Sequence, residues 1–174
     1  MHKIIVIVSL IVTLCVVNWS IASKEKHLSD GKTIYLELAP LDPRSLMQGD
    51  YMALRFKMAN EVQRALPATR NEQMSQQEIS NTEGNVVVTL DERNVATYSR
   101  IDNGEELADD EIKIQYRVRN NRVKFATNAF FFQEGNAKIY QPARYGQFKV
   151  DDNGELLLAS MYDKDLKELG STRN

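Results

Sequence analysis

The N-terminal segment constrains this chain most, because residues 4–22 form an uninterrupted run without a charged side chain. Within "IIVIVSLIVTLCVV" only Ser9 and Thr13 have polar side chains. The run has 19 residues, which is just long enough to cross the hydrocarbon core of a bilayer as a helix. Trp19 lies where an interfacial aromatic side chain is common. We therefore expect residues 1–22 to be a single transmembrane anchor.

Two other structures fit the same segment. The sequence "SIA" before Ser23 resembles the small-residue cleavage site of a signal peptide, whose removal would leave a secreted or periplasmic protein. A buried core helix fits less well, because the run is apolar on every side. For an anchor or a signal peptide, Lys3 stays in the cytoplasm and the rest of the chain is exported. The expected location is the cytoplasmic (inner) membrane, with the domain on the extracytoplasmic side.

The remaining chain reads as a linker and one domain. Residues 23–32, "SKEKHLSDGK", are polar and charged and predict a short linker. Residues 33–174 are long enough for one domain of ordinary size. The formal net charge of -2 gives no general attraction to nucleic acid. The single cysteine, Cys15, excludes an internal disulfide.

Alternation of apolar and polar side chains predicts strands over residues 33–39 and 50–58. In the second strand, Met52, Leu54, Phe56 and Met58 share the face that we expect to enter the core. Three hairpins are predicted from residues 85–90 with 95–101, 112–119 with 122–132, and 147–150 with 155–162. Their turns lie at residues 91–94, at Asn120–Asn121 and at Asn153–Gly154.

Helical signals in the domain are few. A short helix is expected over residues 60–66, one or two helical turns within 134–143, and a last helical turn in 163–169. The pattern therefore predicts a mainly β, antiparallel fold, either a small barrel or a sandwich, with one or two short helices behind a single N-terminal transmembrane helix.

The residue types that carry common chemistry are scarce. The two histidines, His2 and His27, are expected outside the domain, which leaves no transition-metal site and no histidine base for nucleophilic catalysis. The glycines are scattered singly, so no phosphate-binding loop is predicted. The "DDNGE" run at residues 151–155 lacks the ligand spacing of a calcium loop and is explained by a hairpin turn. We predict no catalytic, cofactor-binding or metal-binding residues.

One enzyme class needs a closer comparison. Residues 46–50, "LMQGD", match the end of the signal-peptidase nucleophile box S-M-x-P-T-L-x-x-G-D. The alignment puts Leu41 at the nucleophile position, with Pro43 one residue out of place and Ser45 where the box has threonine. A hydroxyl nucleophile is indispensable for that chemistry, so the match predicts an inactive relative at most.

The motif "GDYMALRF" and a second block around "ARYG" resemble the GDYXXLXY family of uncharacterised bacterial and archaeal proteins. The resemblance covers about residues 33–160, and Phe56 replaces the final tyrosine of the family motif. It implies a single membrane helix and an exported β-rich domain, in a family often encoded beside multi-pass membrane proteins and without established catalytic residues. The residues that carry the resemblance are Asp42, Pro43, Arg44, Gly49, Asp50, Tyr51, Leu54, Phe56, Glu134, Gly135, Ala143, Arg144 and Tyr145.

Two surfaces are candidates for interaction. On the strand of the family motif, Tyr51 and Arg55 point away from the face that enters the core, and Asp50 is expected to lock the preceding turn. A turn at Asn120–Asn121 places like charges opposite one another on the two strands, and their repulsion is mildly destabilising. An acidic partner or anionic lipid would relieve this repulsion. A solvated edge that discourages strand pairing is the alternative explanation. This basic stripe consists of Lys113, Arg117, Arg119, Arg122 and Lys124.

We therefore expect a non-enzymatic, membrane-anchored extracytoplasmic domain that acts as an accessory or interaction partner of a membrane protein complex, with a multi-pass membrane protein as partner. The first alternative is an envelope ligand-binding or sensor module that uses a groove under residues 59–84. The second is the inactive relative of a Ser-Lys signal peptidase.

Overall fold

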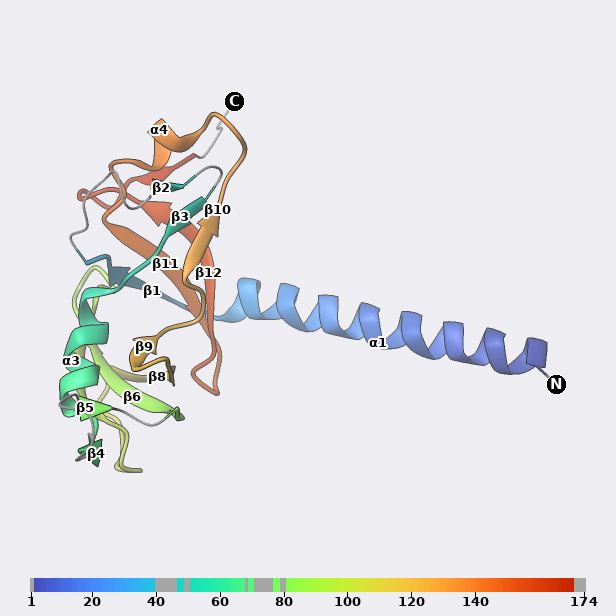
Figure 1. Cartoon of the computed structure of the whole chain (residues 1–174), viewed down its shortest axis with the longest axis horizontal. Helices are drawn as coiled ribbons and strands as arrows, with labels where there is room; N and C mark the ends of the chain where they lie inside the picture. The colour runs from blue at the N-terminus through green and yellow to red at the C-terminus, as the bar shows by residue number, and fades with distance from the viewer. Residues whose placement is uncertain are drawn as a thin grey trace.

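A computed structural model describes residues 2–39, 47–48, 51–67, 69–70, 77–78 and 81–170 of the chain. Helix α1 (His2–Asp30) projects from a β-rich body, which also contains α3 (Lys57–Ala65) and α4 (Ala137–Tyr140) (Figure 1). The strands are β1 (Lys32–Glu37), β2 (Met47–Gln48), β3 (Tyr51–Ala53), β4 (Thr69–Arg70), β5 (Gln77–Glu78), β6 (Glu83–Leu90), β7 (Ala96–Ile101), β8 (Glu111–Arg119), β9 (Arg122–Lys124), β10 (Ala129–Phe131), β11 (Tyr145–Val150), β12 (Leu156–Tyr162) and β13 (Glu168–Leu169). All ladders between these strands are antiparallel, which confirms the predicted fold class.

Helix α1 is exposed along the whole apolar run, residues 4–22. By length and composition it is the one helix among the described residues that is able to cross a membrane. The helix does not stop at the end of the apolar run. Residues 23–30, which we expected to belong to a linker, are helical, and Gly31 alone separates the helix from β1. Most of these residues are ordinary helix formers, and the last turns pack against the domain.

The first sheet has the strand order β1-β11-β12-β13. Ile34 and Leu36 of β1 are buried, as the alternation predicted. Just beyond β1, the backbone N–H of Ala39 donates to the carbonyl of Arg55 at 2.8 Å, and Leu38 bridges Phe56. This contact joins the first sheet to β3 and, through β3, to β10. Strand β3 also pairs with β2, so the sheets β13-β12-β11-β1 and β10-β3-β2 are joined by this antiparallel bridge, and we call the two together the curved sheet.

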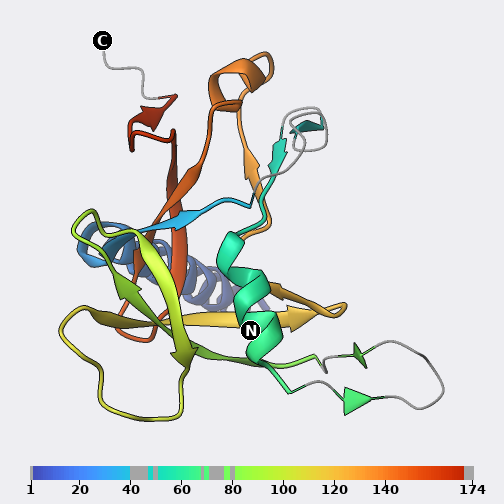
Figure 2. The same cartoon turned by 90° about the vertical axis from the view of Figure 1, so that its left-hand side faces the viewer.

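The second sheet has the order β7-β6-β8-β9. Two backbone hydrogen bonds connect it to the first: Tyr35 donates to Asn94 at 2.9 Å, and Gln115 donates to Gly154 at 2.8 Å. Helix α3 packs on β7, β9 and β1, and lies over this junction in Figure 2. The core fills the space between the sheets and α3, and its largest fully buried side chains are phenylalanines 125 and 148.

Three hairpin loops share one design that starts at an aspartate. In each, one carboxylate oxygen of the aspartate accepts hydrogen bonds from the backbone N–H groups two and four residues later. The residue three positions after the aspartate has a positive φ. The predicted two-residue turn at Asn153–Gly154 is therefore one residue out, since residues 152 and 153 form the turn and Gly154 takes the left-handed position. Residues 163–167 form the third such loop and β13 follows it, so the helical turn predicted over residues 163–169 is wrong. The three loops begin at Asp91, Asp151 and Asp163.

The predicted strand over residues 50–58 is shorter than the alternation indicated. Strand β3 ends at Ala53, and helix α3 begins at Lys57, three residues before the predicted helix. Met58 and Val62 are four residues apart and both buried, which is the period of a helix. Met58 therefore belongs to α3, although it also fits the alternation of the preceding strand. The core assignment of Met52, Leu54, Phe56 and Met58 is confirmed, because all four are buried.

The predicted strand over residues 122–132 is two strands. Its first part, β9, pairs with β8, and its second part, β10, leaves that sheet to pair with β3. Ala126 has a φ of 39° at the break, and the hydroxyl of Thr127 donates to the Ala129 carbonyl at 2.9 Å. A positive φ at a non-glycine residue redirects the chain, which an apolar pattern alone does not reveal.

Candidate functional site

The described part of the family motif, residues 51–56, starts with β3 and ends at Phe56, directly before α3. Leu54 and Phe56 are buried and Arg55 is exposed, so the two predicted faces are confirmed for these positions. The ring of Tyr51 contacts the ring of Phe131, with centroids 5.8 Å apart. The remaining residues of this part of the resemblance, and those of the signal-peptidase comparison, lie outside the described residues: Asp42, Pro43, Arg44, Gly49 and Asp50, with Leu41 and Ser45.

The two family blocks meet in the core at Phe56. Its ring contacts Phe148 edge-on at 5.5 Å between centroids, and Phe125 at 6.3 Å. A Cβ placed on Gly146 would lie 3.0 Å from Phe148 Cε2 and 3.6 Å from Phe56 Cε1. The glycine therefore leaves room for the aromatic cluster, which brings the two motif blocks into contact.

The rest of the second block is structural. Arg144 uses its backbone to connect three strands, since its N–H donates to Tyr162 at 2.7 Å and its carbonyl accepts from Leu38 at 2.8 Å. The other members take ordinary structural positions: exposed Glu134, Gly135 with a φ of 84°, buried Ala143, and Tyr145 at the start of β11. The side chains of this block do not converge on a site.

The basic stripe has the predicted register. Arg117 pairs with Lys124 and Arg119 with Arg122, across a turn where Asn120 and Asn121 have φ values of 53° and 59°. Positive φ at both central residues is the signature of a type I′ hairpin turn.

Acidic side chains of the same chain neutralise part of the stripe. The sequence of β8 and β9 alone did not predict these ion pairs. Arg119 forms an ion pair with Glu83, and Lys113 Nζ lies 3.7 Å from a carboxylate oxygen of Asp102. Arg117 Nη2 donates to the carbonyl of Ala126 at 2.7 Å. Among the described residues, no ion pair involves Arg117, Arg122 or Lys124. These three cations keep their charge available to a partner.

Arg117 and Lys124 also line the larger of two described cavities, which we call the edge groove. It has a volume of about 810 Å³ and lies between β10 and β12, with β6 and β8 along one wall. Its lining includes the aromatic Phe130 and Phe131 and the three leucines that begin β12. Phe131 is 74 % exposed, an unusual position for an aromatic side chain of this size.

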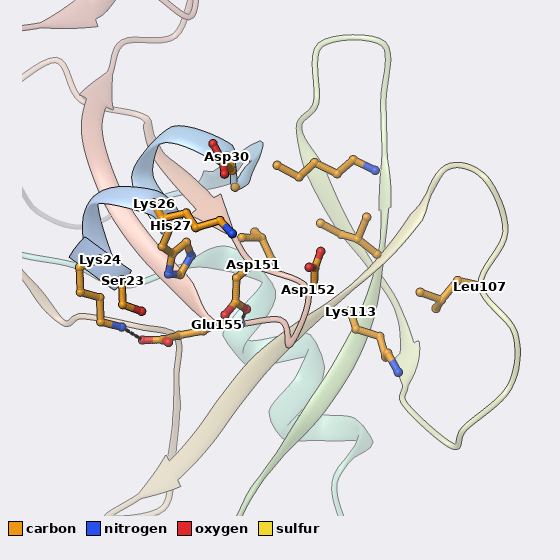
Figure 3. A pocket seen from close by; sticks show the side chains of 14 residues that line it. Ser23, Lys24, Lys26, His27, Asp30, Leu107, Lys113, Asp151, Asp152 and Glu155 are labelled. Carbon is orange, nitrogen blue, oxygen red and sulfur yellow. Dashed lines mark hydrogen bonds and ion pairs between the residues drawn. The ribbon is translucent and has the colours of Figure 1, made fainter. Parts of the chain in front are cut away.

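The second cavity, which we call the helix-end pocket, has a volume of about 500 Å³ and lies where α1 meets the domain (Figure 3). His27 on α1 is only 8 % exposed, and its Nε2 lies 3.0 Å from the carbonyl of Lys149 on β11. Lys24, one turn earlier, forms an ion pair with Glu155 at 2.5 Å. Lys149 Nζ donates to the carbonyl of Gly31 at 3.3 Å. These contacts fix the end of the apolar helix to the first sheet.

The same pocket contains a group of possible metal ligands that the sequence did not reveal. Atoms of His27, Asp151 and Glu155 lie within 4.8 Å of one another, so the expectation that both histidines lie outside the domain is wrong for His27. Figure 3 shows why we assign no metal to it: the Lys24 ammonium already contacts Glu155. Asp151 in turn accepts two backbone N–H groups of its own turn. A divalent ion would have to displace that ammonium.

Two titratable side chains near the sheet junctions have shifted pKa values. Hydrogen bonds from the Ala108 N–H and from Arg100 lower the pKa of Glu111 below its ordinary value of 4.5. Burial, helped by the neighbouring Tyr35, raises the pKa of Tyr162 to about 12. Neither side chain lines a described cavity. We interpret both shifts as consequences of packing.

The family described as "GDYXXLXY protein" matches residues 13–161, from the middle of the apolar helix to the end of β12. Comparisons with curated proteins and with solved structures give no match. The matched region contains β3, β11 and the aromatic cluster that joins them, and covers most of the chain. The chain belongs to the GDYXXLXY family.

Proposed function

We propose that this protein is a non-enzymatic domain, anchored in the cytoplasmic membrane by α1 and exposed on the extracytoplasmic side, that serves as an accessory subunit of a membrane protein complex. The observation that carries the proposal is the continuity of α1. An apolar, fully exposed helix runs without a break into a segment that is ion-paired and hydrogen-bonded to the β domain.

The continuous helix favours a retained anchor over a cleaved signal peptide. The candidate cleavage site before Ser23 is helical on both sides, so no break separates the apolar run from the segment that contacts the domain. The contacts of Lys24 and His27 begin within two turns of that site. A domain held this closely faces whatever membrane protein lies beside α1, which suits an accessory role.

The experiment is affinity purification of the full chain in a mild detergent, followed by identification of the proteins that accompany it. We expect a multi-pass membrane protein in stoichiometric amount. A matched control scrambles the order of residues 4–22 at constant composition, which keeps the anchor and changes its helix surface. Loss of the partner in that control places the contact on α1, and retention places it on the β domain. Purification of the full chain without any stoichiometric membrane protein would contradict the proposal.

A ligand-binding or sensor module is the second candidate, favoured by the helix-end pocket. Its volume of about 500 Å³ is within the range of small-molecule sites, and it lies at the end of the apolar helix. Four lysines and four carboxylates line it, which suits a ligand that carries both charges: Lys24, Lys26, Lys32, Lys113, Asp30, Asp151, Asp152 and Glu155. Native mass spectrometry of the chain released from detergent would show a bound small molecule if this second function holds, and the mass of the chain alone if it does not.

A further inference from the structure

Two strand edges line the edge groove without a described strand between them. Strand β12 pairs with β11 from Leu156 to Tyr162, but on its other side β13 pairs only with Met161 and Tyr162. Strand β10 pairs with β3, and none of the described strands pairs with its outer edge. On that edge the Thr127 hydroxyl already bonds the N–H and the carbonyl of Ala129, so the groups left for a further strand begin at Phe131. Residues 129–131 of β10 and 156–158 of β12 both line the groove. Backbone N–H and C=O groups along a free edge are a template for a further strand.

The directions of β10 and β12 determine the direction of a strand added between them. Each step along the curved sheet from β12 through β11, β1 and β3 to β10 is antiparallel. Four reversals leave β10 and β12 parallel to each other. One strand that runs against both would continue the alternation and close the curved sheet into a barrel, which removes both free edges.

The side chains of the groove specify the chemistry of that strand. Phe130, Phe131 and the leucines of β12 offer apolar surface, and Arg117 and Lys124 offer positive charge. Two acidic side chains also line the groove, but Glu83 is paired with Arg119 and Glu155 with Lys24. The charge left for a partner is positive, so an acidic, partly apolar segment complements it.

We propose that the edge groove accepts an extended acidic segment of the membrane partner as an inserted strand, antiparallel to both β10 and β12. This inference rests on the proposed accessory function and specifies how the partner binds. Main-chain hydrogen bonds to both edges supply the affinity, and the phenylalanines and the two cations select the side chains.

The test uses the full chain in detergent and a synthetic peptide of about seven residues that alternates valine and glutamate, an ordinary strand length. Its control is the same peptide with alternate amide nitrogens methylated, which keeps the charge and removes strand addition. We expect the methylated peptide to bind at least about tenfold more weakly. Hydrogen exchange should slow at Phe131 and at residues 156–160 when the unmethylated peptide binds.

Matched variants test the side chains. Lys124→Glu should weaken peptide binding about fivefold or more, whereas Arg122→Glu, on the same strand but not lining the groove, should leave it unchanged. Phe131→Ala should also weaken it and is not expected to affect folding, because the ring is largely exposed.

Several results would overturn the inference. The first is that the peptide does not bind, and the second is that the methylated peptide binds equally well. The third is that hydrogen exchange at the edge amides is already slow without peptide and becomes slower as the chain concentration rises. The last result would mean that a second copy occupies the groove. If the membrane partner co-purifies equally with Lys124→Glu and Phe131→Ala, the accessory function stands and the inserted strand is wrong. If the peptide binds as expected but no membrane protein co-purifies, the accessory function itself fails.

Discussion

Truncation of Phe56 to alanine should lower the free energy of unfolding by about 4 kcal/mol. The ring is 4 % exposed, and loss of a buried phenylalanine side chain costs about 3–5 kcal/mol including the cavity that it leaves. The edge-on contacts with Phe125 and Phe148 support the upper part of that range. Because Gly146 lies beside the ring and has no side chain to move into the space, relaxation of the cavity is limited.

The assay is thermal and urea unfolding of the full chain in nonionic detergent, followed by circular dichroism of the β domain. A loss of this size corresponds to a Tm lower by about 8–16 °C for a domain of 150–250 residues. Phe131→Ala is the matched control, since it removes the same side chain from a site that is 74 % exposed and should change the stability by less than about 0.5 kcal/mol. Equal stabilities of the two variants would refute the assignment of the family motif to the core.

Three further predictions use other parts of the domain. Gly146→Val should destabilise the domain by about 2 kcal/mol, because its Cβ would lie 3.0 Å from Phe148, and unfolding by urea measures this. The pKa of Glu111 is lower in the folded chain, so its contribution to stability is complete above pH 4.5 and is lost as the pH falls through its pKa in the folded chain. In Glu111→Gln, the free energy of unfolding should therefore fall less steeply with decreasing pH in the acid range. The pKa of Tyr162 is raised to about 12, so its contribution to stability is complete below pH 10 and is lost between pH 10 and 12. Burial also raises the pKa of Tyr116, so absorbance titration should show a late tyrosine component that becomes smaller in Tyr162→Phe.

Local pattern was enough to predict most of the β architecture. Alternation on β1, the asparagine turn after β8 and the hairpin between β11 and β12 depend on neighbouring residues, and all were predicted in place or within one residue. The buried face of the family motif was predicted correctly for the same reason. Side chains two residues apart on a strand must face the same layer.

The errors occur where a long-range contact decides the local structure. Residues 23–30 have the composition of a linker, but they stay helical where His27 packs against β11. The chain from residue 122 onward has a continuous strand pattern, but Ala126 turns it from the second sheet into the first. Neither event has a signature in the surrounding sequence.

The candidate sites were harder to predict than the fold. The basic stripe was predicted residue by residue, but its ion pairs with Glu83 and Asp102 depend on β6 and on the segment after β7. The edge groove was not predicted, because its two walls are about 25 residues apart in sequence and meet only through the curvature of the sheet. The helix-end pocket was missed because His27 was assigned to a linker.

In the proposed function, α1 remains as an anchor and holds the domain outside the cytoplasm. The most direct measurement places single cysteines at exposed residues 122 and 131 of a chain in which Cys15 is replaced, and treats intact cells with a membrane-impermeant maleimide after permeabilisation of any outer envelope layer. Both cysteines should be labelled, on a full-length 19.9 kDa chain that sediments with the membrane fraction. A shortened, soluble chain, or labelling only after the cytoplasmic membrane is disrupted, would contradict it.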